Sequence, residues 1–377
     1  MVENDFRKEF QNIRTLVVKV GSRILTGDNK TTPHTKRVKS LVDSIATLTK
    51  LGKRVLLVSS GAIAHGMQAL HLEKRPGTIP AKQACASIGQ IRLMNMYASH
   101  FAKHDILIGQ VLLTWDDLRD KKRYLNLRNT LFHLFDVNAV PIINENDSVG
   151  IEEIRFGEND TLAAQLSLLV QADLFINLTD INGLYDSNPR ENKNAKHIQV
   201  VPELTPTVFS FASDRINDIS VGGMATKLKA ADMVTKAGLY ALIADGFHYS
   251  LLDVLSDGSI GTCFLPNTKK MPARHRWIAF TGKPAGSVVV DDGAYKAISE
   301  KGKSLLPAGT KRIIGTFKVG DMVDIITDKA IVCARGLINY SSSDAAKICG
   351  CKTHEISMVL GQKAFDELIH RDNLVVL

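Results

Sequence analysis

The chain has 377 residues, of which 45% are hydrophobic and 23% charged, and its formal net charge is +8. This length is typical of two domains rather than one, and the composition is that of a globular protein rather than a disordered or fibrous one. No apolar run approaches the ~20 residues that a membrane-spanning helix needs, so we expect no contact with a membrane.

The N-terminus and the cysteines indicate a reducing compartment. The first ten residues, MVENDFRKEF, lack the apolar segment of a secretory signal. The five cysteines are scattered and odd in number, which does not fit a disulfide framework. We therefore expect a cytoplasmic protein. The basic balance is compatible with phosphate-bearing ligands or RNA, and equally with a charge that only maintains solubility.

Residues 15 to about 265 alternate apolar strands with amphipathic helices. The predicted strands are Thr15–Val20, Val55–Ser59, Ile106–Leu113, Ala139–Asn144, Leu174–Leu178 and Tyr240–Ala244. The predicted helices are 36–50, 80–104, 129–138, 161–171 and 223–237. This alternation predicts an α/β domain with a mostly parallel sheet sandwiched by helices. In such a sheet, ligands bind at the carboxyl ends of the strands.

The pattern changes after residue 265. Residues 266–276 are rich in proline and basic side chains and are predicted to form a linker. Short β-type runs follow at 286–290, 313–319, 321–327 and 330–334, with helices predicted at 292–300, 344–348 and 362–369. We therefore expect two domains, at residues 1–265 and 277–377, of which the second is small and β-rich.

Three predicted strand ends carry loops rich in small residues. They read VVKVGS (17–22), VSSGAIAHG (58–66) and VGGMATKLKAAD (221–232). Small residues let the backbone approach a ligand, and N–H groups at a helix start favour an anion. One such loop would indicate only a tight turn, but three favour a phosphorylated ligand. Neither G-x-x-x-x-G-K-[ST] nor a G-x-G-x-x-G after a strand is present.

Two lysines occupy unusual positions. Lys19 lies inside an apolar strand, where a buried ammonium group needs an anionic partner. Lys227 lies at the start of the Gly-Gly helix, where the helix dipole repels a cation unless an anion is also present. The alternatives are an edge-strand lysine that reaches solvent and a solvated helix lysine.

Six motifs in order resemble the amino-acid kinase family: VVKVGS, VSSGAIAHG, INENDSV, FGENDTLAA, LTDINGLYDSNPR and GGMATKLKAAD. Within the family they are similar to enzymes that phosphorylate the γ-carboxylate of L-glutamate with ATP, the first step of proline biosynthesis. The segment from about Trp277 resembles the PUA domain that bacterial members often carry. The resemblance implies ATP and Mg²⁺ as cofactors, no metal held by protein side chains, a homo-oligomer (dimer or tetramer) and feedback inhibition by L-proline.

The resemblance also implies roles for individual residues. Lys19 would contact the transferring phosphate, Lys227 would be the second catalytic lysine, and Asp160 would organise both. The implied glutamate-binding residues are Ser60, Gly61, Asp147 and Asn159. The implied ATP-binding residues are Lys19, Gly21, Thr179, Asp180, Val221, Gly222, Gly223, Met224, Ala225, Thr226 and Lys227. Val221 and Glu158 depart from the family pattern, which often has threonine and aspartate there.

The implied chemistry is consistent with these residue types. A γ-carboxylate, with an unperturbed pKa of ~4.3, is already ionised at neutral pH and needs no general base. Catalysis then requires alignment of two anions and stabilisation of charge on the transferred phosphoryl group. Two lysines on different loops suit that task, and Asp147 would bind the ammonium group of glutamate.

Other interpretations of these residues remain open from the sequence alone. Asn159 or Asp160 would also serve as a helix N-cap, and Asp147 as a turn residue. Cys333, Cys349, Cys351 and His354 hint at zinc, but C-x-C spacing is poor for a tetrahedral site.

Two other functions compete with phosphorylation of glutamate. The first is that of another amino-acid kinase, of the acetylglutamate, aspartate or uridylate type. The second is RNA binding through the PUA-like segment beside a vestigial kinase domain. The aromatic residues of that segment are dispersed and form no evident stacking cluster.

Overall fold

The computed structural model describes residues 7–26, 35–150, 159–212, 223–267, 271–362 and 364–377. The chain divides into two units. The second consists of Met271–Leu377, which begins within the predicted linker 266–276, and the short segment Leu118–Lys121. Each unit has a hydrophobic core of its own.

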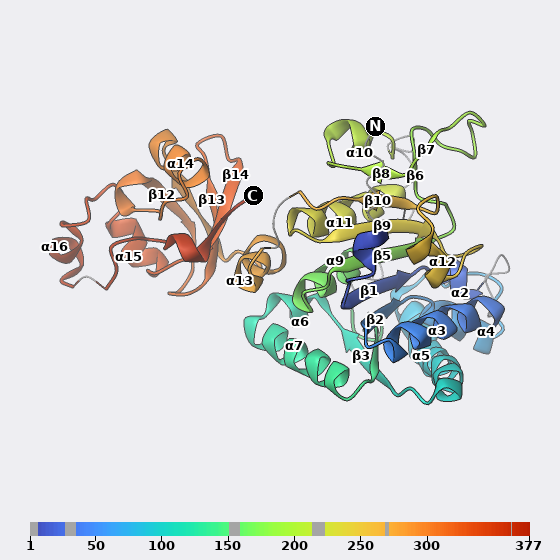
Figure 1. Ribbon diagram of the computed structural model, residues 1–377. Helices are drawn as coiled ribbons and strands as arrows, with labels where there is room; N and C mark the ends of the chain where they lie inside the picture. Colours follow the sequence, from blue (N-terminus) through green and yellow to red (C-terminus); the bar gives the residue numbers. More distant parts are fainter. Residues whose placement is uncertain (1–6, 27–34, 151–158, 213–222, 268–270, 363) are drawn as a thin grey trace. The chain divides into compact units, whose positions relative to one another are not determined.

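The first unit is built on an eight-stranded sheet with the strand order β3-β4-β2-β1-β5-β9-β10-β8 (Figure 1). The strands from β3 to β9 in this order run parallel, whereas β10 runs antiparallel to β9. The strands are β1 (Thr15–Val20), β2 (Arg54–Ser59), β3 (Ile108–Leu113), β4 (Val140–Glu145), β5 (Leu174–Thr179), β8 (Val200–Val201), β9 (Tyr240–Asp245) and β10 (Thr262–Phe264). A separate two-stranded sheet pairs β6 (Leu184–Tyr185) with β7 (His197–Ile198). The predicted α/β fold with a mostly parallel sheet is confirmed.

Helices cover both faces of the large sheet. The helices of this unit are α1 (Arg7–Phe10), α2 (Ser22–Thr26), α3 (Thr35–Lys50), α4 (Ala62–Ala69), α5 (Ile79–Phe101), α6 (Trp115–Arg119), α7 (Lys121–Asp136), α9 (Asn159–Leu169), α10 (Pro206–Ser210), α11 (Met224–Lys236) and α12 (Leu251–Ser256), with a 3₁₀ turn at Ala102–His104. None of the described helices is long and apolar enough to cross a membrane.

The alternation of side chains along the central strands assigns the two faces. Leu16, Val18 and Val20 of β1 lie in one core with residues of α3, α5 and α12. Since successive strand residues point to opposite faces, Lys19 points to the other face, where α9 and α11 contact β1 and β5. The continuous apolar strands predicted from the sequence are therefore buried on both faces.

Element boundaries differ from the predictions at a few places. Helix α7 begins at Lys121 rather than at residue 129, because its polar first turns hide a buried stripe that includes Tyr124 and Leu127. The short elements β8, β10 and α12 were not predicted, since two to six residues carry too little periodicity.

The second unit contains a five-stranded sheet with the order β12-β11-β13-β14-β15. The strands are β11 (Gly286–Val290), β12 (Thr310–Gly315), β13 (Met322–Ile326), β14 (Val332–Leu337) and β15 (Leu374–Val376). The helices are α13 (Ala273–Arg276), α14 (Asp292–Ser299), α15 (Ser342–Lys347) and α16 (Ile356–Leu360), with a π-helical turn at Trp277–Thr281 and 3₁₀ turns at Pro307–Gly309 and Arg371–Asn373. The predicted β-rich character of this unit is confirmed.

The prediction of a helix at Gln362–Ile369 is wrong. The helix in this region is α16, which ends at Leu360. The next residue, Gly361, has a φ of 75°, a left-handed conformation that glycine adopts without strain. Downstream, Ile369 forms a β-bridge with Leu305, and the backbone of Phe365 hydrogen-bonds the Tyr340 hydroxyl. Leu368 and Ile369 are thus buried through pairing with distant segments rather than by helical periodicity, whereas Phe365 is exposed.

Candidate active site

The predicted site residues gather at the carboxyl edge of the large sheet. Lys19 is the fifth residue of β1, and Ser60 follows β2 directly. Asp147 follows β4, and Thr179 ends β5. Because these strands are parallel, their carboxyl ends share one edge. The chain leaves β1 towards β2 and leaves β5 towards β9 on the opposite side, so β1 and β5 flank a topological switch point, where ligands bind in such sheets.

Lys19 and Asn177 are neighbours in the sheet. They are paired in register across β1 and β5, and both point to the face covered by α9 and α11. Asp160, in the first turn of α9, reaches this same point from above the sheet. The two strands and the helix thus bring one lysine, one amide and one carboxylate together away from solvent.

Asp160 is the centre of a buried polar cluster. Its Oδ1 lies 2.6 Å from Lys19 Nζ and accepts a 2.9 Å hydrogen bond from Asn177 Nδ2. Its Oδ2 lies 3.4 Å from Lys227 Nζ and accepts a 2.8 Å hydrogen bond from the Thr226 hydroxyl. Lys19 and Lys227 are each only 6% exposed, and Asp160 is 2% exposed. The alternatives of a snorkelling Lys19 and a solvated Lys227 are therefore wrong.

The cluster carries more positive than negative charge. Burial by itself raises the pKa of Asp160, but attraction to Lys19 and Lys227, with the hydrogen bonds, outweighs this and holds the pKa well below its usual range. Burial lowers the pKa of Lys227; attraction to Asp160 opposes this, and repulsion from Lys19 adds to it, so the pKa stays below its ordinary value. One carboxylate thus faces two ammonium groups, which is an arrangement that an additional anion would complete.

Asn159 connects α9 to the end of β2. Its Nδ2 donates to the Ser60 hydroxyl at 2.8 Å and to the Ser59 carbonyl at 3.2 Å. The same Nδ2 lies 3.3 Å from Asn144 Oδ1, and Asn144 in turn donates to Gln90 at 3.0 Å. Asn159 Oδ1 is buried and has no hydrogen-bond partner among the residues that the structure describes. It is an acceptor that a ligand with N–H groups would satisfy.

Two predicted glycines allow close backbone approach. Gly61, the residue before α4, has a φ of 104°, which a residue with a side chain rarely adopts. Gly21 donates its N–H to the Leu178 carbonyl at 3.3 Å, and a Cβ added there would lie 4.0 Å from Lys19 Nζ. Both positions keep the edge of the sheet beside the cluster free of side chains.

Asp147 lies in the turn that follows β4. The N–H groups of Val149 and Gly150 both bond the Asn146 carbonyl, and the Ser148 hydroxyl lies 2.9 Å from that of Ser87 on α5. The Asp147 side chain is half-buried. The turn interpretation is thus correct, and it is compatible with a ligand contact.

The predicted nucleotide side lies at the end of β5. Thr179 is buried and donates its hydroxyl to Asp180 at 3.2 Å. Asp180 also binds Arg23, which follows β1, and Arg190 at 3.0 Å. Burial raises the pKa of Asp180, but Arg23 and Arg190 outweigh this and lower it. Two arginines therefore surround the carboxylate of Asp180, which directly follows β5.

The glycine-rich segment is only partly described. Val221, Gly222 and Glu158 lie outside the described residues. Gly223 precedes α11, and Met224, Ala225 and Thr226 form its first turn. The Thr226 hydroxyl is placed for Asp160 and for the Gly223 carbonyl, both at 2.8 Å. Lys227 follows in the same turn and points to the cluster.

Sequence reasoning missed several residues of this site. They are Asn177, Asn144, Gln90, Arg23 and Arg190. The available signal was an asparagine inside each of two apolar strands, LFINL and VPIIN. Arg23 and Arg190 carry no such signal, because surface arginines are common.

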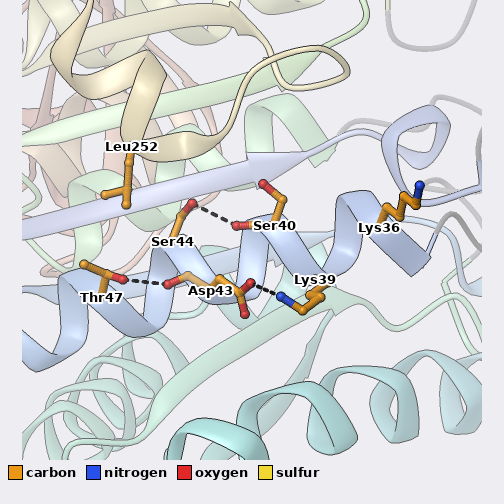
Figure 2. A pocket seen from close by; sticks show the side chains of 7 residues that line it. All are labelled: Lys36, Lys39, Ser40, Asp43, Ser44, Thr47 and Leu252. Carbon is orange, nitrogen blue, oxygen red and sulfur yellow. Dashed lines mark hydrogen bonds and ion pairs between the residues drawn. The ribbon is translucent and has the colours of Figure 1, made fainter.

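Two further features of the described residues lie apart from this cluster. No group of three or more His, Cys, Asp or Glu side chains within the described ranges is arranged to hold a metal ion. A hollow of about 270 Å³ lies along α3 and is lined also by Leu252 of α12 (Figure 2). Its polar groups satisfy one another: Lys39 pairs with Asp43 at 2.6 Å, and Ser44 donates to the Ser40 carbonyl at 2.8 Å.

The chain is similar to known proteins over nearly its whole length. The family model described as "Amino acid kinase family" matches residues 14–245, and that of the PUA domain matches residues 286–360. Glutamate 5-kinase from Syntrophus aciditrophicus is 45% identical over 376 residues, which are 99% of this chain and 97% of that protein. Glutamate 5-kinase from Thermoanaerobacter sp. is 47% identical over 363 residues, covering 96% and 97%. The solved structure of UMP kinase from Bacillus anthracis has a TM-score of 0.46 at 14% identity, covering 68% of this chain and 97% of that one.

Proposed function

The chain belongs to the amino acid kinase family, and from that premise we propose that it transfers the γ-phosphoryl group of ATP to the γ-carboxylate of L-glutamate. Its relatives are named after this activity, which is the first step of proline biosynthesis. The observation that carries the proposal is the buried cluster of Lys19, Asp160 and Lys227 at the switch point of the sheet.

The reaction needs no proton transfer. One oxygen of the ionised γ-carboxylate attacks the γ-phosphorus, the bond from that phosphorus to the β–γ bridging oxygen breaks, and ADP leaves with the electron pair. The product is an acyl phosphate. Both reactants are anions, so the protein's task is to hold them in line and to neutralise charge on the phosphoryl oxygens. Lys19 and Lys227 supply that charge from two sides, and Asp160 fixes both.

We propose that Mg²⁺ enters with the phosphates of ATP rather than on protein carboxylates. Asp160 already faces two ammonium groups and Asp180 two guanidinium groups, so neither is placed to be a metal ligand. When bound, Mg²⁺ neutralises part of the charge on the phosphates. Gly21, Thr179, Asp180, Arg23 and the start of α11 would line the nucleotide, with Val221 and Gly222 continuing this segment.

We propose that glutamate binds on the side of the Lys19–Asp160–Lys227 cluster opposite the nucleotide. The buried Asn159 Oδ1 is a ready acceptor for an ammonium group, and the carboxylate of Asp147 supplies a counter-charge. The Ser60 hydroxyl and the Gly61 backbone, at the end of β2, would bind a substrate carboxylate. A substrate with an acylated amino group would lose both contacts to the ammonium group, which favours free L-glutamate over acetylglutamate.

Four further proposals concern the protein as a whole. We propose that it forms a homo-oligomer, that L-proline inhibits it, that it is cytoplasmic, and that its PUA domain is available to bind RNA. Light scattering tests the homo-oligomer, and turnover with added L-proline tests the inhibition. Cell fractionation tests the localisation, and salt-dependent RNA binding tests the role of the PUA domain.

An acceptor panel tests the proposed function. ADP release from MgATP is followed with L-glutamate, N-acetylglutamate, L-aspartate and UMP in parallel, with ATP alone as the blank. We expect release only with L-glutamate. A preference for UMP or N-acetylglutamate would assign the chain to another branch of the family, and salt-dependent RNA binding without any turnover would favour the RNA-binding function.

A further inference from the structure

We infer that Asn177 is a positioning residue for phosphoryl transfer, which orients the Asp160 carboxylate so that both lysines are held at the reacting phosphate. The inference rests on the proposed function. The Asn177 side chain does not contact the reacting phosphate directly. It acts through the Asp160 carboxylate, which fixes both Lys19 and Lys227.

The hydrogen-bond donors around Asp160 are divided evenly between its two carboxylate oxygens. Oδ1 receives Lys19 at 2.6 Å and Asn177 at 2.9 Å, whereas Oδ2 receives Thr226 at 2.8 Å and Lys227 at 3.4 Å. Each carboxylate oxygen thus has one cationic and one neutral donor. The neutral donors come from β5 and from the first turn of α11, so they fix the carboxylate plane between two rigid elements.

The orientation of the Asn177 amide is forced by its neighbour Asp160. Asp160 is ionised, because its pKa is held well below the usual range, and an ionised carboxylate only accepts hydrogen bonds. Asn177 must therefore turn Nδ2 towards Asp160. Its Oδ1 is consequently buried, with no hydrogen-bond partner in the part of the chain that the structure describes.

This arrangement of the Asn177 amide is unfavourable for the stability of the fold. Asn177 is fully buried in β5 between Ile176 and Leu178, and an unsatisfied buried acceptor destabilises a fold. An aliphatic side chain of the same size would avoid that penalty. Polar groups that oppose stability in this way are expected at functional sites.

Asn177 holds the Asp160 carboxylate in place when substrates are bound. A bound phosphate competes with Asp160 for the N–H donors of Lys19 and Lys227. The neutral donors of Asn177 and Thr226 then keep the carboxylate in the plane that directs both ammonium groups to the phosphate. Since Asn177 does not itself contact substrate, its loss should affect kcat more than the KM for ATP or L-glutamate.

The test replaces Asn177 by leucine, a close match in size without the amide. We expect Asn177→Leu to lower kcat about 10- to 100-fold, to change either KM by less than about threefold, and to keep or raise Tm. Ser167→Ala is the matched control: Ser167 is also fully buried on α9, bonds the Ala163 carbonyl at 2.8 Å, and takes no part in the cluster. Its kcat should equal that of the wild type.

Three results would overturn the inference. They are an unchanged kcat in Asn177→Leu, a kcat that falls together with Tm, and a rise in KM without a change in kcat. A second variant, Asn177→Asp, keeps the size but replaces the donor by an acceptor that repels Asp160, so it should lose at least as much kcat as the leucine variant; wild-type turnover would contradict the assigned role. If wild-type protein shows no glutamate-dependent turnover, the proposed function fails, while the Tm comparison of Asn177→Leu still tests the penalty of the buried amide.

Discussion

At the residue scale, Lys227 is the side chain whose loss should be most informative. Lys227→Ala removes one of the two charges that stabilise the transferred phosphoryl group, so we expect kcat to fall about 10²- to 10³-fold. Lys229→Ala is the matched control, because Lys229 is an exposed lysine on the same helix. Steady-state ADP release measures both variants. Near wild-type turnover in Lys227→Ala would refute the role of this lysine.

Asp160 should couple the stability of the fold to pH. Asp160→Asn leaves Lys19 and Lys227 buried without a counter-charge, so at neutral pH the free energy of unfolding should fall by about 3–5 kcal/mol. The folded-state pKa of Asp160 lies below its unfolded value of ~3.9, so its stabilisation is present above that pH and is lost as the pH falls further.

The measurement is urea unfolding of wild type and Asp160→Asn across a pH series. The stability difference between them should stay constant above about pH 5 and shrink below about pH 4. A difference that is independent of pH down to about pH 3 would show that the Asp160 charge contributes nothing to stability.

At the scale of elements, α4 and α5 pack through two glycines. A Cβ at Gly66 would lie 1.8 Å from the Cys85 carbonyl oxygen, and one at Gly89 equally close to that of Ala62. Helix α4 starts at the Gly61 loop, and α5 carries Gln90 and the Ser87 contact to the turn of Asp147. The closeness of these helices therefore supports the proposed glutamate side of the site.

Gly66→Ala tests this packing. The added methyl group meets backbone atoms that cannot yield without moving α5, so we expect a loss of about 3 kcal/mol or more in the free energy of unfolding. Gly77→Ala, where a Cβ would meet nothing within 4 Å, should change stability by less than about 0.5 kcal/mol. Thermal and urea unfolding compare the two. Equal stability of both variants would contradict the close packing.

The sequence predicted the parallel strands and most of the long helices, but it missed the first half of α7 and several short elements. The parallel strands were visible because their apolar runs are continuous, and Lys19 stood out because it interrupts one. Asn177 interrupts another, but its role depends on the register of β1 against β5, which no local pattern reveals. The same holds for the bridge between Ile369 and Leu305, which lies in a segment for which a helix was predicted.

At the scale of the whole molecule, we expect the first unit, which carries the match to the amino acid kinase family, to be catalytically active without the second unit. Lys19, Asp160 and Lys227 all precede Met271, and the core of the large sheet is built from residues up to Leu265. We expect a chain of residues 1–270 to fold and to keep L-glutamate-dependent turnover within about threefold of the full chain. A folded fragment with turnover reduced more than about tenfold would show that the second unit contributes to catalysis.

The central claim is that the phosphoryl acceptor is the γ-carboxylate of L-glutamate, and trapping of the acyl phosphate tests it most directly. Hydroxylamine attacks an acyl phosphate and releases phosphate, which converts the product into γ-glutamyl hydroxamate. Full-length protein with MgATP, L-glutamate and hydroxylamine should form this hydroxamate in step with ADP, and should form none when ATP or L-glutamate is left out. ADP release without hydroxamate, or no release with L-glutamate under conditions in which UMP is phosphorylated, would contradict the account.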